Sequence, residues 1–241
     1  MPSNKASRRP SSPAASKPKN WPSHMPYLTA PLLAPTLSPA ALTLLRSRAA
    51  APHAIILPAA QPQGPCPLVK ITPIASPSHP AKGQSGLFAA RHLKPGTLIL
   101  AYLGAIHGPS GPADADANAD GNSDYDLALD RDAGLAIDAA RAGNEARFIN
   151  DYRGVAPRPN AEFRDAWDPA RRLRGVAVCV LPPVQASNGK AKPKSKGIAK
   201  GEEILVSYGR GFWSARRGTE KESKGELQGA ESMMKTWVGR S

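Results

Sequence analysis

The stretch Asn144-Glu145-Ala146-Arg147-Phe148-Ile149-Asn150 decides the fold when it is taken together with a second stretch, Lys200-Gly201-Glu202-Glu203-Ile204-Leu205-Val206-Ser207-Tyr208-Gly209. The first continues to Pro159-Asn160, and the second is followed by Phe212-Trp213. Two shorter runs precede both of them, Gly86-Leu87-Phe88-Ala89 and Tyr102-Leu103-Gly104. Each long stretch alone is a weak signal, whereas the order of all four runs is specific.

In this order the runs resemble a SET domain, the fold of most protein lysine methyltransferases. The resemblance covers roughly residues 68–213. It implies a β-rich α+β fold of several small β-sheets with a knot-like C-terminal core, flanked by disordered tails. Since the chain has no cysteine-rich run, we expect a solitary SET domain without pre-SET or post-SET zinc regions.

Composition places the folded part towards the C-terminal side. Of the 26 prolines, 17 lie in residues 1–80, where they remove backbone donors and interrupt helices and central strands. No acidic residue precedes Asp114, and residues 1–113 carry eleven Lys and Arg. The predicted organisation is a basic, mostly disordered leader over 1–65 with a short helix near 39–48, a SET domain over 66–215 with flexible insertions at 109–123 and 182–197, and a polar tail over 216–241.

Hydrophobic patterning predicts many short strands and few helices. Ser38 and Pro39 provide an N-cap and a first-turn proline for the helix of the leader. A second small helix is expected near 139–147. The strands are predicted at 68–74, 86–91, 97–102, 125–130, 135–138, 175–181 and 203–208.

Neither a metal site nor a membrane span is expected. Cys66 and Cys179 are too few for a disulfide framework or a four-cysteine zinc site. Residues 116–127 fit part of an EF-hand loop, but Leu127 stands where the bidentate carboxylate should be. No run approaches eighteen apolar residues, so no membrane span is expected. The two cysteines do not indicate secretion, so we expect an intracellular protein, nuclear or cytoplasmic with the nucleus favoured. We also expect a monomer.

The resemblance implies S-adenosyl-L-methionine as cofactor and a lysine-containing basic peptide as substrate. The attacking amine must be neutral, and neutralising a free lysine at pH 7 costs about 4.6 kcal/mol. A sulfonium about 4 Å from the ammonium repels it by about 4 kcal/mol at an effective dielectric near 20. The protein therefore needs a narrow, dry channel and hydrogen-bond acceptors rather than a strong general base.

The resemblance also implies which residues act. Tyr208 is expected at the methyl-transfer pore, and Tyr125 either lines the lysine channel or packs as a strand aromatic. Asn150 is expected to hold the amino-acid end and the adenine of the cofactor. The remaining cofactor-binding residues implied by the motifs are Gly86, Leu87, Phe88, Arg147, Phe148, Asp151 and Trp213.

The chain departs from the family pattern after Asn150. The usual His is Asp151, the usual Cys is absent, and the segment that reaches Pro159-Asn160 is four residues longer. The insertion either bulges out or reshapes the cofactor site. Asp151 either favours a cationic ligand or is a solvated loop charge. The two glycines before Leu87, Gly83 and Gly86, are also one residue further apart than usual.

Two main classes of function follow, beside a weaker third, a nucleic-acid-binding protein that acts through its basic arms but has no nucleic-acid fold motif. The first is an S-adenosylmethionine-dependent protein-lysine N-methyltransferase that acts on a histone or another basic protein. The alternative is a catalytically weak or inactive SET-fold module that binds chromatin or a protein partner. The basic leader and the loop from Lys190 to Lys196 are also suited to weak contacts with nucleic acid.

Overall fold

The structure, a computed structural model, describes residues 16–60, 63–109, 123–182 and 196–209. The chain divides into two units, Met1–Val206 and Ser207–Ser241, and residues 207–209 are the described part of the second. The helix predicted near the start of the chain is α1 (Pro39–Leu45), with the Ser38 hydroxyl accepting a hydrogen bond from the Ala41 amide.

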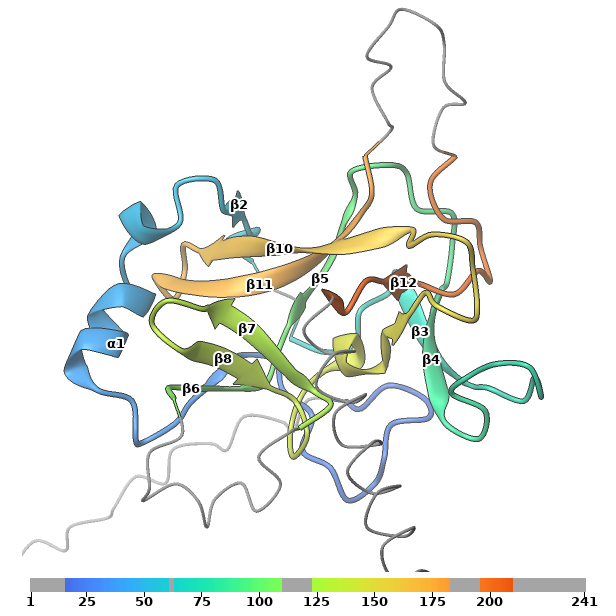
Figure 1. The fold of residues 1–241 in the computed structure, drawn as a ribbon, viewed down its shortest axis with the longest axis horizontal. Helices are drawn as coiled ribbons and strands as arrows, with labels where there is room; N and C mark the ends of the chain where they lie inside the picture. The colour runs from blue at the N-terminus through green and yellow to red at the C-terminus, as the bar shows by residue number, and fades with distance from the viewer. Residues whose placement is uncertain (1–15, 61–62, 110–122, 183–195, 210–241) are drawn as a thin grey trace, which may run out of the picture. The chain divides into compact units, whose positions relative to one another are not determined.

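The described residues of the first unit form short strands in four small sheets (Figure 1). Two sheets have four strands, in the orders β1-β6-β8-β7 and β2-β10-β11-β5, and two are the pairs β12-β9 and β3-β4. The strands are β1 (Leu32–Leu33), β2 (Ile55–Ile56), β3 (Val69–Pro73), β4 (Ser85–Ala89), β5 (Leu98–Tyr102), β6 (Ala105–His107), β7 (Asp126–Asp130), β8 (Leu135–Asp138), β9 (Asn150–Asp151), β10 (Ala161–Asp168), β11 (Leu173–Val180) and β12 (Leu205–Val206). This arrangement confirms the predicted β-rich fold class.

The longest pairing is the antiparallel hairpin of β10 and β11, in register from Ala161 with Val180 to Asp168 with Leu173. β11 was predicted from its run of Val and Ala, because a strand buried on both faces is apolar throughout. β10 was not predicted. Its first half carries Glu162, Arg164 and Asp165, which stay exposed or half-buried. With these charges, β10 does not show the apolar run or the alternation that predicts a strand, although its second half is buried.

Two predicted elements are shorter than expected. The helix near 139–147 is a 3-10 turn, Glu145–Phe148, because the Asn144 side chain bonds the backbone of Ala101 and Leu103 and holds its own backbone extended. The strand predicted at 203–208 is reduced to β12. Glu203 pairs instead with Phe88 of β4, so the chain changes partner within three residues.

Much of the predicted leader is part of the folded unit, which corrects the expectation of disorder for residues 16–60 and places the start of the folded part well before residue 66. Trp21 is buried and packs edge-on against Phe148, with ring centroids 5.7 Å apart. Leu45 on α1 is fully buried, and β1 and β2 add a parallel strand to each large sheet. The proline-rich sequence is compatible with these strands because each added strand is only two residues long.

His107 on β6 forms a contact with β7, although β8 lies between these two strands in the sheet. Its Nε2 lies 3.1 Å from Asp126 Oδ1 on β7, and its Nδ1 lies 2.9 Å from the Gly108 carbonyl oxygen. Both ring nitrogens face acceptors, so the arrangement favours the charged imidazolium. The hydrogen bond to Asp126 is the main cause that raises the pKa of His107 to about 9, and burial opposes it.

This pair predicts a pH-dependent contribution to stability. Because the folded-state pKa lies above its ordinary value of 6.5, the contribution is complete below that pH and is lost as pH rises through about 9. The pair is partly exposed, so we expect an effect of about 1 kcal/mol. Urea unfolding of His107→Gln should show a smaller fall in the free energy of unfolding between pH 6 and 9 than the wild type. Equal falls would contradict the assignment.

Candidate functional site

The two long stretches that decide the fold meet in the structure. β9, which begins at Asn150, pairs in parallel with β12, and Asn150 lies opposite Leu205. The Tyr152 amide continues the pairing by donating to the Val206 carbonyl oxygen at 3.0 Å. The apolar side chains of residues 204–206 are almost completely buried, which fixes this strand in the core beside β4 and β10 (Figure 1).

Glu203 lies at the centre of this junction, and only 9% of its side chain is exposed. Its Oε1 accepts a hydrogen bond from Asn150 Nδ2 at 2.8 Å, and its Oε2 lies 3.0 Å from His79 Nε2. A carboxylate can only accept, so it holds the Asn150 amide with the nitrogen towards Glu203 and the oxygen turned away. The predicted cofactor residue Asn150 is therefore oriented by a partner from the second stretch.

The run that contains Gly86 forms the third side of the junction. The Ile204 amide donates to the Leu87 carbonyl oxygen at 2.8 Å, and the Ala89 amide donates to the Glu202 carbonyl oxygen at 2.9 Å. A Cβ on Gly86 would lie 2.5 Å from Glu203 Oε1 and 3.0 Å from Phe88 Cε2. A residue larger than glycine at this position would therefore have to displace the Glu203 carboxylate. The Leu87 side chain is fully buried in the core.

The insertion after Asn150 starts beside β12 and ends beside the same strand. It folds into a compact turn in which the Val155 and Ala156 amides both donate to the Tyr152 carbonyl oxygen. At its far end, the Asn160 side chain donates to the Glu203 carbonyl oxygen and accepts from the Leu205 amide, each at 2.8 Å. Of the two alternatives for this segment, the structure is that of a bulge.

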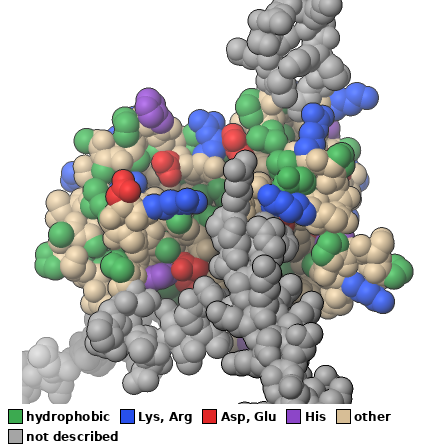
Figure 2. All heavy atoms as spheres, viewed as in Figure 1, with side chains coloured by type: hydrophobic (Ala, Val, Ile, Leu, Met, Phe, Trp, Pro, Cys, Tyr) green, Lys and Arg blue, Asp and Glu red, His purple; other side chains and the backbone are tan. Residues whose placement is uncertain are grey.

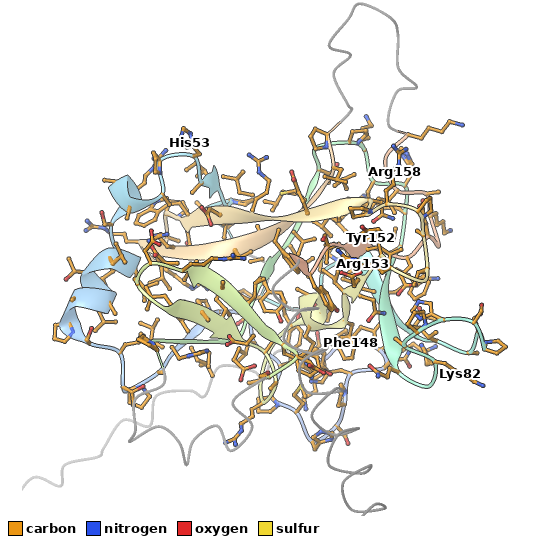
Figure 3. All side chains as sticks on the ribbon, viewed as in Figure 1. His53, Lys82, Phe148, Tyr152, Arg153 and Arg158 are labelled. Carbon is orange, nitrogen blue, oxygen red and sulfur yellow. The ribbon has the colours of Figure 1, made fainter. Side chains whose placement is uncertain are left out.

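Asp151 is buried, so it is not a solvated loop charge. Its Oδ2 lies 2.8 Å from Arg153 Nη1, and its Oδ1 accepts from the Arg153 amide at 2.9 Å. Tyr152 and Arg153 lie together beside β12 in the side-chain view (Figure 3). The carboxylate that replaces the usual His is therefore neutralised within its own turn.

A second cluster joins three more predicted residues. The Arg147 guanidinium lies 4.1 Å from the centroid of the Tyr125 ring and 4.9 Å from that of Phe148, and its Nε donates to the Ala139 carbonyl oxygen at 3.0 Å. Cation–π contacts of this kind hold both the arginine and the rings in place. Tyr125 is half-buried, and its ring stacks on Arg147 rather than lying in the apolar core.

The two remaining predicted residues lie beyond the first unit. Tyr208 belongs to the second unit and follows β12 by two residues. Trp213 lies outside the described residues, as do the residues of the EF-hand-like match before Ser123 and the loop from Lys190 to Lys194. Their roles stay predictions.

Sequence reasoning did not assign His79 to the site. It is a lone histidine in a loop rich in Ser and Pro, where no spacing distinguishes it. Glu203 and Asn160 were quoted as parts of the motifs but had no assigned role. A carboxylate directly before a fully apolar run was the available signal for Glu203, because a charge drawn into such a run must find partners.

The donor and acceptor pattern fits a cationic ligand. The oxygen of the Asn150 amide is an acceptor, and the Glu203 carboxylate behind it adds negative potential. An ammonium group such as the one on S-adenosylmethionine matches this pattern. Within the described ranges there is no cluster of three His, Cys, Asp or Glu that could hold a metal ion, and none of the helices there has the length and apolar character to span a bilayer.

The close approach at Gly86 gives a direct test of the junction. Gly86→Ala should displace the Glu203 carboxylate and lower the free energy of unfolding by about 1–3 kcal/mol, as overpacking does. Gly175→Ala is the matched control, since a Cβ there meets nothing within 4 Å. Chemical denaturation should leave this control within about 0.5 kcal/mol of the wild type. Equal stability of the two variants would show that Glu203 does not lie against Gly86.

The chain was compared with protein families, curated proteins and solved structures. The family model described as "SET domain" matches residues 84–209, more than half of the chain. A comparison with curated proteins gave no match.

Similar solved structures include the polycomb repressive complex 2 of Chaetomium thermophilum (22% identity over 58% of this chain and 15% of that one, TM-score 0.41). Another is ctPRC2 in an autoinhibited conformation bound to S-adenosylmethionine (19% identity, 64% and 17%, TM-score 0.42). A third is KRYPTONITE in complex with mCHH DNA, an H3(1-15) peptide and SAH (21% identity, 58% and 23%, TM-score 0.38). The match spans less than a quarter of each of these longer chains. The family model, which covers the junction of Gly86, Asn150 and Glu203, decides the assignment: this chain belongs to the SET domain family.

Proposed function

We propose that this protein is an S-adenosylmethionine-dependent protein-lysine N-methyltransferase whose substrate is a histone or another basic protein. The observation that carries the proposal is the Asn150 amide, held by Glu203 at the β9–β12 junction of a SET domain. An asparagine fixed in this way presents one acceptor in one direction. That is what a site for the ammonium end of a small ligand requires.

S-adenosylmethionine, when bound, would supply the methyl group on a sulfonium. Asn150 would accept from the ammonium of the ligand, and the backbone of residues 86–88 would lie along it. The guanidinium of Arg147 contacts the rings of Tyr125 and Phe148 and would hold them in place as walls of the ligand site. Asp151 supports the turn beside the site through its pair with Arg153.

Tyr208 is proposed as the catalytic residue, together with Tyr125 in the lysine channel. A phenol at the pore accepts weak C–H···O contacts from the methyl group and orients the incoming amine. Trp213 is proposed to cover the ligand. These assignments come from the family motifs.

The second candidate is a SET-fold module that binds chromatin or a protein partner without catalysis. The specific observation in its favour is that Asp151 replaces the usual His and is occupied by Arg153. A binding module does not need the oriented amide of Asn150, so ligand binding separates the two candidates.

The positive charge of the chain is the basis for proposing its macromolecular partners and its cellular location. The acid-free leader carries seven Lys and Arg and is suited to weak, salt-sensitive contact with nucleic acid, as expected of a nuclear or cytoplasmic protein. On the face drawn in Figure 2, Lys and Arg are dispersed among neutral and hydrophobic side chains and do not form a continuous patch. The proposed nucleic-acid contact is assigned to the leader and to the loop from Lys190 to Lys196 because of their positive charge in the sequence.

Asn150→Ala should weaken the binding of S-adenosylmethionine at least tenfold, because the oriented acceptor is lost. The wild type at a hundredfold excess of ligand over Kd should gain about 2.7 kcal/mol of stability, which thermal unfolding detects. Arg158→Ala, an exposed position of the same insertion (Figure 3), is the control and should bind as the wild type. No thermal shift of the wild type at millimolar ligand would favour the binding module instead.

Tyr208→Phe should lower kcat for methyl transfer to a histone peptide by about 10²-fold, with Kd for S-adenosylmethionine changed less than about threefold. The reason is that the phenolic oxygen acts on the reacting groups and not on the bound ligand as a whole. Tyr152→Phe removes a hydroxyl from a half-buried tyrosine of the insertion and is the matched control. Unchanged kcat in Tyr208→Phe would remove this residue from the catalytic role.

A further inference from the structure

His79 lies in the loop between β3 and β4, far in sequence from the motifs but in contact with Glu203. Its Nε2 is 3.0 Å from Glu203 Oε2, and each side chain is only 9% exposed. Its Nδ1 accepts a hydrogen bond from the Ala81 amide at 3.0 Å. The histidine is thus held from both sides of its ring.

These two contacts fix the tautomer. A backbone amide can only donate, so Nδ1 carries no proton, and the proton of the neutral ring is on Nε2. The Nε2–H bond then donates to Glu203. The contrast with His107 is direct, since both nitrogens of His107 face acceptors whereas one nitrogen of His79 faces a donor.

The hydrogen bonds therefore converge on the Glu203 carboxylate, which accepts one bond on each oxygen. The Ala81 amide donates to His79, His79 donates to Oε2 of Glu203, and Asn150 donates to Oε1. If His79 is removed, the carboxylate loses the partner of one oxygen and is free to rotate about its Cγ–Cδ bond. The orientation of the Asn150 side-chain amide is then no longer fixed, because its partner Glu203 can move.

We propose that His79 is a positioning residue of the ligand site: through Glu203, it holds the Asn150 amide with its oxygen presented to the ammonium of the bound ligand. This inference rests on the proposed function, because it identifies the ligand by that function. His79 itself does not contact the ligand. It is a residue of this chain's own β3–β4 loop and not of the motifs that define the family match.

The loop is built to keep the ring in place. The His79 amide donates to the Ser76 carbonyl oxygen, the Lys82 amide donates to the His79 carbonyl oxygen, and the Gly83 amide donates to the Ile74 carbonyl oxygen, so the segment closes on itself before β4 begins. The insertion packs on the same loop, because a Cβ on Gly154 would lie 2.6 Å from Pro80 Cγ. The longer segment after Asn150 thus supports the loop that carries His79.

The test compares three variants by calorimetric titration with S-adenosylmethionine. His79→Leu keeps the volume but removes the donor, and it should raise Kd about tenfold. His79→Gln retains an N–H that reaches Oε2, and it should restore Kd to within about threefold of the wild type. His53→Leu is the control. His53 is exposed and lies at the opposite end of the unit from the Lys82 loop in Figure 3, so its Kd should not change.

A double-mutant cycle separates positioning from a general effect on folding. In the Asn150→Ala background, His79→Leu should change Kd less than twofold, because the amide that it orients is absent. Full additivity, or wild-type affinity of His79→Leu alone, would overturn the inference and leave the proposed function intact. Failure of the wild type to bind would overturn both.

A measurement without ligand completes the test. Nitrogen NMR of the imidazole at neutral pH should find the tautomer protonated on Nε2 in the wild type. A ring protonated on Nδ1, or on both nitrogens, contradicts this set of hydrogen bonds whatever the ligand does.

Discussion

A buried carboxylate that accepts hydrogen bonds from two side chains joins the parts of this site. Glu203 lies against Gly86 and accepts hydrogen bonds from Asn150 and His79. Its carboxylate therefore connects three segments of the chain: residues 79–86, the stretch around Asn150 and its own stretch. Leaving such a carboxylate without partners in the interior costs several kcal/mol. The three segments are therefore coupled, and the direction of the Asn150 amide is a consequence of how Glu203 is satisfied.

The departures from the family pattern leave this junction intact. The insertion after Asn150 begins on β9 and returns through Asn160 to the backbone of residues 203 and 205, so its extra length adds a bulge without shifting β12. Asp151, which replaces the usual His, pairs with Arg153 in the same turn. The altered charge is thus balanced locally, and the acceptor at Asn150 keeps its environment.

The sequence predicted the parts of the fold where one local pattern decides the outcome. β3, β4, β5, β8 and β11 were found within about two residues of their expected bounds, because apolar or alternating runs specify strands. β10 was hidden by the charges on its exposed half, and the leader was misjudged because its two-residue strands form only against partners elsewhere in the chain. Of the residues that meet at Glu203, Asn150 and Gly86 were pointed out by the motifs. His79 was not, since its role arises from a hydrogen bond to a residue 124 positions away.

We propose that the junction of Gly86, Asn150 and Glu203 is where a positively charged methyl donor binds. Backbone amide shift mapping by NMR during titration with S-adenosylmethionine examines this proposal residue by residue. The largest changes should fall on residues 86–88 and 147–151, with the amides of the β10–β11 hairpin unaffected. Changes centred on any other part of the chain, with the signals of Gly86 and Asn150 unmoved, would contradict it.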